Sequence, residues 1–393
     1  MKAARIHPDF FEQFTCIADK CPLTCCQEWK IAVDEETNQR WKKLAPPKTV
    51  SVQKKALSEY IIEKDGERVI GLNPVHRCPF LSENKLCRLV RAYGDEVLSE
   101  TCTVFPREVH EFEGHEEETL MPCCPAVIDL WRAAGTVQFP EVPGVGHDGD
   151  NEGEEMILLQ IREQIIRLLQ KEQKPLREAL LESFYILLEF HKETLSEHFV
   201  SEYFSDKTLE ELETAIREVE VPLADTIAEC SELLQDLAVN YRKEGLYLCY
   251  LDPVIEEAEA LSDGFDAQEL TEKWMAFQSQ FLQYEPLLRC FLQNEVFSDL
   301  VMPEGNLEQM ILQLQWIAIT CTAIRQSLFL KWIREGEGPL SYEDVRDYMV
   351  VISRMTGYDE EDVREYLVNS FETLVWDWGY FALIVGNGTV PKQ

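Results

Sequence analysis

The C-terminal part of the chain repeats apolar residues at the spacing of an amphipathic helix. In residues 154–170 the apolar positions that share one face are Ile157, Leu158, Ile161, Ile165, Leu168 and Leu169. Residues 175–191 show the same pattern, and Pro175 suits the start of a helix. The spacing predicts further helices over residues 208–219, 223–241, 267–283, 307–333, 342–355 and 359–375. Because no fixed period relates these segments, we expect an irregular helical domain rather than a solenoid.

The N-terminal part carries shorter and weaker patterns. Residues 26–34 alternate weakly like a short strand, and residues 35–44 are typical of a short helix. Residues 66–73 and 110–122 are predicted to be strands or hairpin arms. Residues 139–155 combine proline, glycine and acidic residues, which is typical of a linker. We therefore predict a mainly α fold in two parts: a cysteine-rich metal-binding region with short strands (residues 1–150) and an acidic helical domain (residues 151–393).

The charge is strongly negative and unevenly distributed. The 393 residues include 37 Lys and Arg against 72 Asp and Glu, a net charge of −35. Residues 1–150 carry 18 basic and 25 acidic side chains, so −28 of the charge falls beyond residue 150. Such a surface repels phosphate backbones, which argues against a nucleic-acid partner. It suits a lysine-bearing protein partner, unless the acidic residues serve only solubility.

Two further absences in the sequence bear on where the protein works. No apolar run approaches the roughly 18–20 residues of a membrane span. The first residues, MKAARIHPDFFEQF, lack the apolar segment of a secretory signal. We expect a cytoplasmic protein without a membrane span.

Cysteine is concentrated at the N-terminal end. Nine of the 13 cysteines lie within the first 124 residues: Cys16, Cys21, Cys25, Cys26, Cys78, Cys87, Cys102, Cys123 and Cys124. Disulfides need an oxidising compartment, and inert buried thiols do not explain this density, so thiolate ligation of a metal is the favoured interpretation. Zinc sites usually contain C-x2-C pairs, which this sequence lacks. The spacing favours a [4Fe-4S] cluster, with zinc as the alternative.

Four segments resemble a known family. They are CIADKCPLTCCQEWKIAVD, RCPFLSENKLCRLV, TCTVFPREV and the Cys124-Pro125 pair, which together span residues 16–126. The pattern is similar to that of the flagellin lysine-N-methylases, which are related to a wider group of cysteine-rich iron- or zinc-binding proteins. The resemblance implies methylation of flagellin lysines with S-adenosylmethionine as donor and an iron–sulfur cluster in the enzyme. The matching cysteines, and hence the predicted ligands, are Cys16, Cys21, Cys25, Cys26, Cys78, Cys87, Cys102 and Cys124.

A single cubane takes at most four protein thiolates, so some of the eight are supporting or a second metal is present. Arg107, five residues after Cys102, is predicted to bind the donor carboxylate or the cluster, because its planar guanidinium can donate two parallel hydrogen bonds to either. A surface arginine after a turn proline is the alternative. The glycines at 144, 146 and 149 match a dinucleotide loop but follow prolines rather than a strand, so they are not expected to bind nucleotide. His110 and His115, which lie among several glutamates, are expected on a solvated hairpin, with an adventitious metal site as the alternative.

The sequence thus leads to two functional hypotheses. The first is an S-adenosylmethionine-dependent protein lysine N-methyltransferase that carries a [4Fe-4S] cluster and acts on flagellin. The second is a non-catalytic, zinc-stapled module that binds a basic protein partner.

Overall fold

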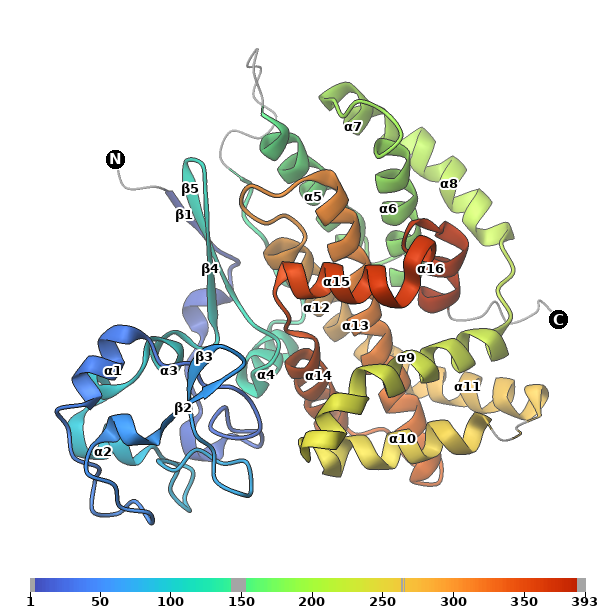
Figure 1. Ribbon diagram of the computed structural model, residues 1–393. Helices are drawn as coiled ribbons and strands as arrows, with labels where there is room; N and C mark the ends of the chain where they lie inside the picture. The colour runs from blue at the N-terminus through green and yellow to red at the C-terminus, as the bar shows by residue number, and fades with distance from the viewer. Residues whose placement is uncertain (1–3, 143–152, 263, 265, 387–393) are drawn as a thin grey trace.

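The computed structural model describes residues 4–142, 153–262, 264 and 266–386. Helices dominate, and two small sheets lie within the first 120 residues (Figure 1). The predicted mainly α fold class is confirmed. In the described residues no helix is long and apolar enough to cross a membrane.

The larger sheet has three strands in the order β1–β5–β4. β1 (Ala4–Ile6) runs parallel to β5 (His115–Leu120), and β4 (Arg107–Phe112) pairs antiparallel with β5. The second sheet is a hairpin of β2 (Ile61–Lys64) and β3 (Glu67–Ile70). Its two turn residues, Asp65 and Gly66, both have positive φ, at 52° and 80°, as a tight hairpin turn of matching twist requires.

The cysteine-rich region has a small hydrophobic core of its own, formed by residues between Ile31 and Val97 that include Trp41, Tyr60 and Phe80. Its helices are short: α1 (Glu35–Trp41), α2 (Arg88–Tyr93) and α3 (Glu100–Val104). Four short 3-10 turns in this region are Phe11–Gln13, Ala18–Lys20, Leu57–Tyr60 and Asp95–Val97. A further 3-10 turn, Leu282–Tyr284, follows α11 in the helical body.

Asp34 joins two of these short helices. Its side chain accepts hydrogen bonds from the backbone N–H groups of Thr37 in α1 (2.7 Å) and Glu100 in α3 (2.9 Å). These bonds outweigh the opposing effect of desolvation and lower its pKa to about 2. The strand predicted over residues 26–34 is wrong. That segment pairs only through isolated bridges, because its start lies beside a loop, where Gln27 meets Arg77, and its end beside β3, where Ala32 meets Val69.

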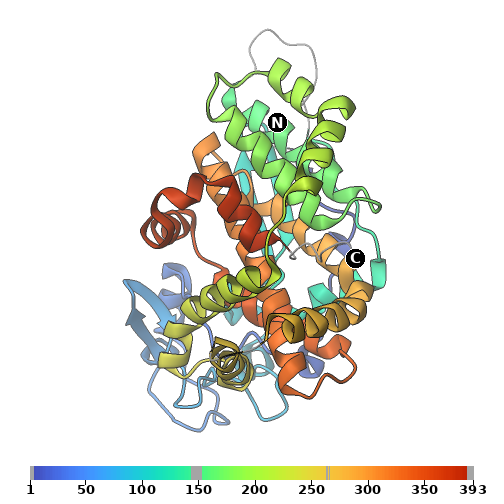
Figure 2. The same cartoon turned by 90° about the vertical axis from the view of Figure 1, so that its right-hand side faces the viewer.

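The helical body contains the longer elements. Its helices are α4 (Pro125–Ala134), α5 (Glu154–Gln170), α6 (Leu176–Phe190), α7 (Glu197–Tyr203), α8 (Asp206–Glu218), α9 (Leu223–Glu244), α10 (Leu248–Ser262), α11 (Ala267–Phe281), α12 (Glu285–Asp299), α13 (Leu307–Arg334), α14 (Tyr342–Thr356), α15 (Glu360–Phe371) and α16 (Trp378–Val385), with a 3-10 turn at Glu372–Trp376. α13 is buried on nearly all sides, and α6, α9, α10, α14, α15 and α16 pack around it. Figure 2 shows α5 to α8 gathered at one end of this body, away from α10 and α11.

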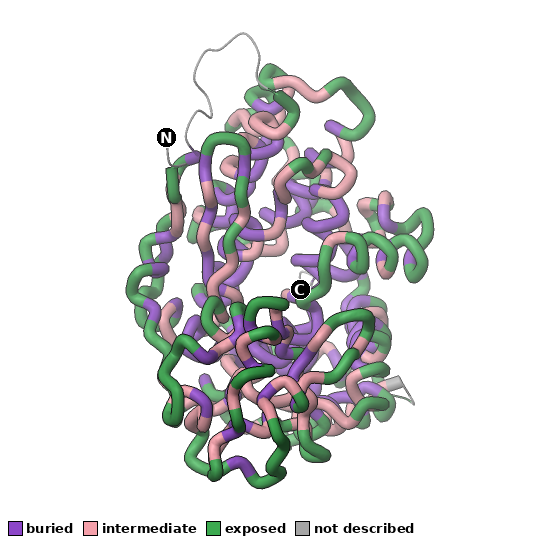
Figure 3. Tube along the Cα trace, turned by 60° about the vertical axis from the view of Figure 1, so that its left-hand side comes forward, coloured by how far each residue is buried: buried purple, intermediate pink, exposed green. Residues whose placement is uncertain are grey.

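The β4–β5 hairpin packs on the helical body rather than standing in solvent. β5 contacts α12, and Phe112 and Leu120 belong to the large core of the helical body. Figure 3 shows buried residues along this hairpin and inside the helices, whereas the loops of the cysteine-rich region are mostly exposed or intermediate. The predicted solvated hairpin is therefore wrong for His115, which is 3 % exposed, because its strand is the central one, between β1 and β4, and packs on α12. The division near residue 150 stays a prediction, since residues 143–152 lie outside the described part.

A buried ion pair fastens the hairpin to α5. Arg162 donates to both carboxylate oxygens of Glu117, at 2.7 and 2.6 Å, and to the backbone carbonyl oxygen of Phe297 at 2.8 Å. Neither Glu117 nor Arg162 is more than 2 % exposed. Burial opposes ionisation of Glu117, but Arg162 and His115 outweigh it and lower its pKa below the ordinary value.

Replacing Glu117 by glutamine is expected to lower the free energy of unfolding at neutral pH by about 3 kcal/mol, because it leaves Arg162 buried without its counter-charge. The stability that a depressed pKa contributes is present above the unfolded pKa, near 4.3 for Glu, and is lost as pH falls through the folded pKa. The difference between wild type and E117Q in urea unfolding should therefore shrink below about pH 4. E113Q, at the exposed hairpin turn, serves as the control. A difference that stays constant across this pH range would contradict the proposed role of the ion pair.

Candidate functional site

Five predicted ligands line one cavity in the cysteine-rich region. The cavity measures about 120 Å³, and its cysteines are Cys25, Cys26, Cys78, Cys87 and Cys102. Apolar side chains complete the wall, including Trp29, Trp41, Phe80 and Phe105. Thiols from four separate stretches of the chain thus meet around an apolar space.

Backbone hydrogen bonds bring these stretches together. The N–H of Cys78 donates to the carbonyl oxygen of Cys26 at 2.8 Å. Cys87 precedes α2 and forms an isolated bridge with Leu81. Cys102 lies in α3, and its N–H donates to the capping hydroxyl of Ser99 at 3.3 Å. Two of the thiols are therefore carried by the first turns of short helices.

The neighbouring thiols Cys25 and Cys26 differ in acidity. A hydrogen bond from the Cys25 thiol lowers the pKa of Cys26 to about 7, against the effect of burial. The same bond and burial raise the pKa of Cys25 well above its ordinary value. Burial raises the pKa of Cys78 and Cys102, the latter to about 11, and the charge of Cys26 adds to both. The charge of Cys26 thus acts on each of the other four thiols of the cavity, and Cys26 is the one that ionises first.

The other predicted ligands, Cys16, Cys21 and Cys124, do not line this cavity. Burial raises the pKa of Cys21, and the neighbouring charge of Cys16 raises it further. Burial raises the pKa of Cys124 to about 11, with Cys21 again contributing. Cys124 immediately precedes α4, and the Sγ of Cys21 donates to the carbonyl oxygen of Leu23 at 3.3 Å. Cys21 thus lies near both Cys16 and Cys124.

Among the described residues, no three cysteine sulfurs lie within 4.8 Å of one another. The [4Fe-4S] and zinc interpretations both stay predictions.

The helical body supplies a buried arginine to this region. Arg354 of α14 is 8 % exposed, and it donates to the carbonyl oxygens of Cys123 (3.1 Å) and Leu23 (2.9 Å). Its third nitrogen, Nη1, is buried without a hydrogen-bond partner. Its charge lowers the pKa values of Cys21, Cys25 and Cys26. An unpaired guanidinium N–H among thiols is a ready donor to a negatively charged group bound there.

Beside Arg354, three non-glycine residues adopt left-handed backbone. Glu28 (φ 61°), His76 (φ 53°) and Tyr247 (φ 53°) are linked to one another. The N–H of Glu28 donates to the carbonyl oxygen of His76 at 2.8 Å, and the N–H of Tyr247 donates to the Glu28 carboxylate at 3.0 Å. Each such residue costs on the order of 1–3 kcal/mol, and such strain clusters at functional sites. Tyr247 is 1 % exposed, and burial raises its pKa to about 12, although the neighbouring guanidinium of Arg354 opposes that rise.

Arg107, the predicted cofactor-binding residue, begins β4 directly after Phe105 and Pro106. Its guanidinium carbon lies 5.2 Å from the ring centre of Phe14 and 5.8 Å from that of Phe11. No carboxylate of the described residues lies within ion-pair distance of it, so its fork is free to bind an anion. Its role stays a prediction, as does the ligand role of the eight cysteines.

The sequence did not reveal Arg354, Tyr247 or Glu28 as residues of this region. Arg354 stands in the last turn of an amphipathic helix, where arginine is common, and only packing shows that it turns inward. The glycines of the dinucleotide-like loop at 144–149 lie outside the described residues.

The fold and the site define a mainly helical protein whose N-terminal region carries a cysteine-lined cavity. The family described as FliB lysine N-methylase C-terminal domain matches residues 162–384, which is more than half of the chain. The chain belongs to this family, as its cysteine pattern predicted.

Relatives in Salmonella agree with this assignment. The flagellar biosynthetic protein FliU of Salmonella muenchen is 32 % identical over 124 residues, which cover 30 % of this chain and 72 % of FliU. The lysine-N-methylases of Salmonella typhimurium and Salmonella choleraesuis are also 32 % identical over 124 residues, covering 30 % of this chain. The matched segment spans only 30 % of each lysine-N-methylase. No solved structure matches the chain.

Proposed function

We propose that this protein is a lysine N-methyltransferase that uses S-adenosylmethionine to methylate flagellin in the cytoplasm. Its family membership supports lysine methylation, and the flagellar name of its FliU relative supports a flagellar substrate. The main observation that supports the proposal is the group of cysteines around one cavity. They occur in a chain whose helical body matches the lysine N-methylase family.

A [4Fe-4S] cluster is the cofactor that these residues fit best. Cys26, Cys78, Cys87 and Cys102 would hold it, and Arg354 would balance its charge from the neighbouring side. Held by all four thiolates, such a cluster would have no iron open to the donor, and its contribution would be to hold the four chain segments of the cavity together. Cys16, Cys21, Cys25 and Cys124 then either support this site or hold a second metal.

The donor site has to differ from that of the common methyltransferase fold. The sheets of the described residues have three and two strands, which are too small for a doubly wound nucleotide-binding sheet. Arg107 is the residue we assign to the donor carboxylate, since its guanidinium is unpaired and stacked on aromatic rings.

The target lysine must lose a proton before it can attack the methyl group, because its ordinary pKa is near 10.4. A site that excludes water lowers that pKa by disfavouring the ammonium form. The −28 net charge beyond residue 150 would attract lysine-bearing flagellin to the protein surface.

The proposal is tested by purifying the protein without oxygen and measuring iron, zinc and absorbance together with methyl transfer. We expect brown protein with absorbance near 400 nm that transfers labelled methyl groups to flagellin lysines, located by mass spectrometry. Colourless protein that holds zinc and transfers no methyl group would favour the non-catalytic module that binds a basic partner.

A further inference from the structure

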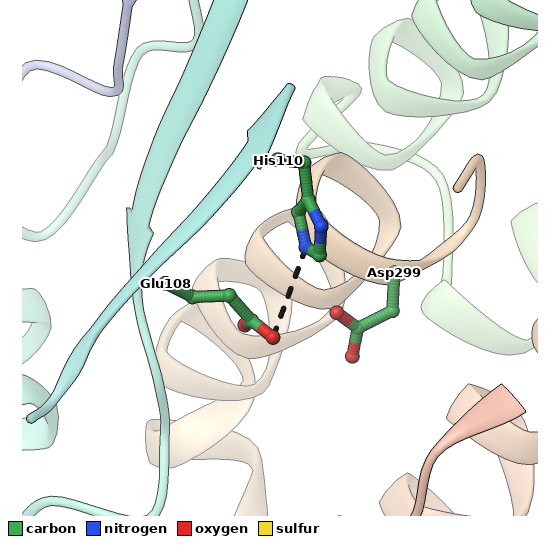
Figure 4. A group of neighbouring side chains, drawn as sticks. All are labelled: Glu108, His110 and Asp299. Atoms are coloured by element: carbon green, nitrogen blue, oxygen red, sulfur yellow. Dashed lines mark ion pairs between the residues drawn. The ribbon is translucent and has the colours of Figure 1, made fainter. Parts of the chain in front are cut away.

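Carboxylate and imidazole groups meet where β4 lies against α12, outside the cysteine-lined cavity. Glu108 and His110 are two residues apart on β4 and therefore share a face, and Glu295 and Asp299 are four apart on α12. Ligand atoms of Glu108, His110 and Asp299 all lie within 4.8 Å of one another. Figure 4 shows the three side chains facing a common space between the strand and the helix.

The imidazole lacks a hydrogen-bond partner at this place. The side chain of His110 is 12 % exposed, and its Nε2 atom is buried without a hydrogen bond. The nearest carboxylate oxygen, Oε1 of Glu108, lies 3.7 Å away, which is too far for a hydrogen bond. Two ligands bound to one ion at about 2.1 Å are about 3.0–3.4 Å apart, so a small closing movement would suffice.

A second group orients the carboxylate. The hydroxyl of Ser298 donates to Oε2 of Glu108 at 2.9 Å, and this bond leaves Oε1 directed at His110. Metal ligands are commonly fixed in this way by an outer hydrogen bond. The arrangement of Glu108 is thus that of an oriented ligand rather than of a free surface carboxylate.

The carboxylates also lack a compensating cation. In the part of the chain that the structure describes, no lysine or arginine nitrogen lies within 4.0 Å of Glu108, Glu295 or Asp299. Burial raises the pKa of Asp299 to about 8, with the charge of Glu108 adding to it. Burial likewise raises the pKa of Glu295, and the charges of Asp299 and Glu108 raise it further. A divalent cation would remove this repulsion and give His110 its missing partner.

We propose that Glu108, His110 and Asp299 bind one divalent first-row transition-metal ion, with Glu295 as a neighbouring carboxylate. One imidazole with hard carboxylate oxygens suits Mn²⁺, whereas the thiols of the cysteine-rich region select softer metals. Because its ligands come from β4 and α12, the ion fastens the hairpin to the helical body. The site also adjoins the cysteines, since the charges of Glu108 and Glu295 act on Cys123.

The test uses the full chain with its cysteine-bound metal in place, after brief treatment with a chelator and a check that iron content is unchanged. MnCl₂ is then titrated by calorimetry and by electron paramagnetic resonance, and the Tm is measured with and without Mn²⁺. We expect one bound Mn²⁺ per chain and a rise in Tm. H110Q and D299N should each weaken Mn²⁺ binding at least tenfold.

D299N gives a readout that does not depend on loss of folding. Without metal it should leave the Tm near the wild-type value, because an amide of the same size replaces the carboxyl group, while the rise in Tm on adding Mn²⁺ should disappear. E111Q, on the exposed face of the same strand, should bind Mn²⁺ as wild type does.

Three results would overturn the proposal. They are the absence of Mn²⁺ binding to the wild type, binding that H110Q and D299N leave unchanged, and equal loss of binding in E111Q. A D299N enzyme with a raised KM for flagellin but unchanged Mn²⁺ binding would assign these carboxylates to the substrate lysine instead.

Discussion

Replacing Cys26 by serine is expected to remove most of the bound iron and to lower the yield of folded protein. Cys26 has a pKa of about 7 and therefore provides thiolate more readily than its neighbours, whose pKa values burial raises. Its carbonyl oxygen also holds the Cys78 loop. Loss of a ligand is a folding defect as well as a chemical one, because metal binding contributes free energy to the folded state.

The measurement is iron per chain and the ratio of absorbance near 400 nm to that near 280 nm in anaerobically purified variants. C78S and C102S should behave as C26S does. C249S, an exposed cysteine outside the cavity, and C123S, beside predicted ligand Cys124, are the matched controls and should keep wild-type iron. Full iron content in C26S, C78S and C102S would refute the assignment of these thiols as ligands.

Replacing Arg354 by glutamine is expected to lower the free energy of unfolding by about 3–5 kcal/mol. Arg354 joins α14 to two loops of the cysteine-rich region through charged hydrogen bonds to the carbonyl oxygens of Leu23 and Cys123, and each such bond contributes about 1.5–3 kcal/mol. Glutamine cannot reach both carbonyl groups, and it removes the positive charge that favours ionised thiols. Cluster retention should therefore fall together with stability.

Two further variants separate charge from hydrogen bonding. R354K keeps the positive charge but lacks the guanidinium that donates to both carbonyl groups. It should therefore retain more iron than R354Q and remain less stable than the wild type. R364Q, at an exposed arginine 3.8 Å from Glu308, should change the free energy of unfolding by less than about 0.5 kcal/mol. Unfolding in guanidinium chloride provides the free energies. An R354Q protein as stable and as rich in iron as R364Q would contradict the role of this arginine.

The amphipathic helices could be predicted from the sequence alone. The helix predicted over residues 154–170 coincides with α5, because one apolar face against a polar one is a local property. The order of the cysteines indicated the family for a similar reason, because the spacing of the cysteines can be read directly from the sequence.

Elements buried on every side could not be found in this way. α12 was missed because almost all of its residues from Leu287 to Ser298 are buried, so no polar face marks its period. α10 was missed as well, and it contains Pro253, which a sequence pattern takes as a helix break.

The grouping of the functional side chains was decided by tertiary structure. The sequence supplied eight cysteines, whereas the packing of four chain segments brings five of them, Cys25, Cys26, Cys78, Cys87 and Cys102, around one cavity. Arg354 reaches that region only because α14 packs beside the loops of Leu23 and Cys123. In the same way, Glu108 and His110 meet Asp299 only where β4 lies against α12. The local sequence determines which secondary structure a segment prefers and which chemical groups it carries. Contacts between distant segments depend instead on how the whole hydrophobic core is buried, and a local sequence pattern does not contain that information.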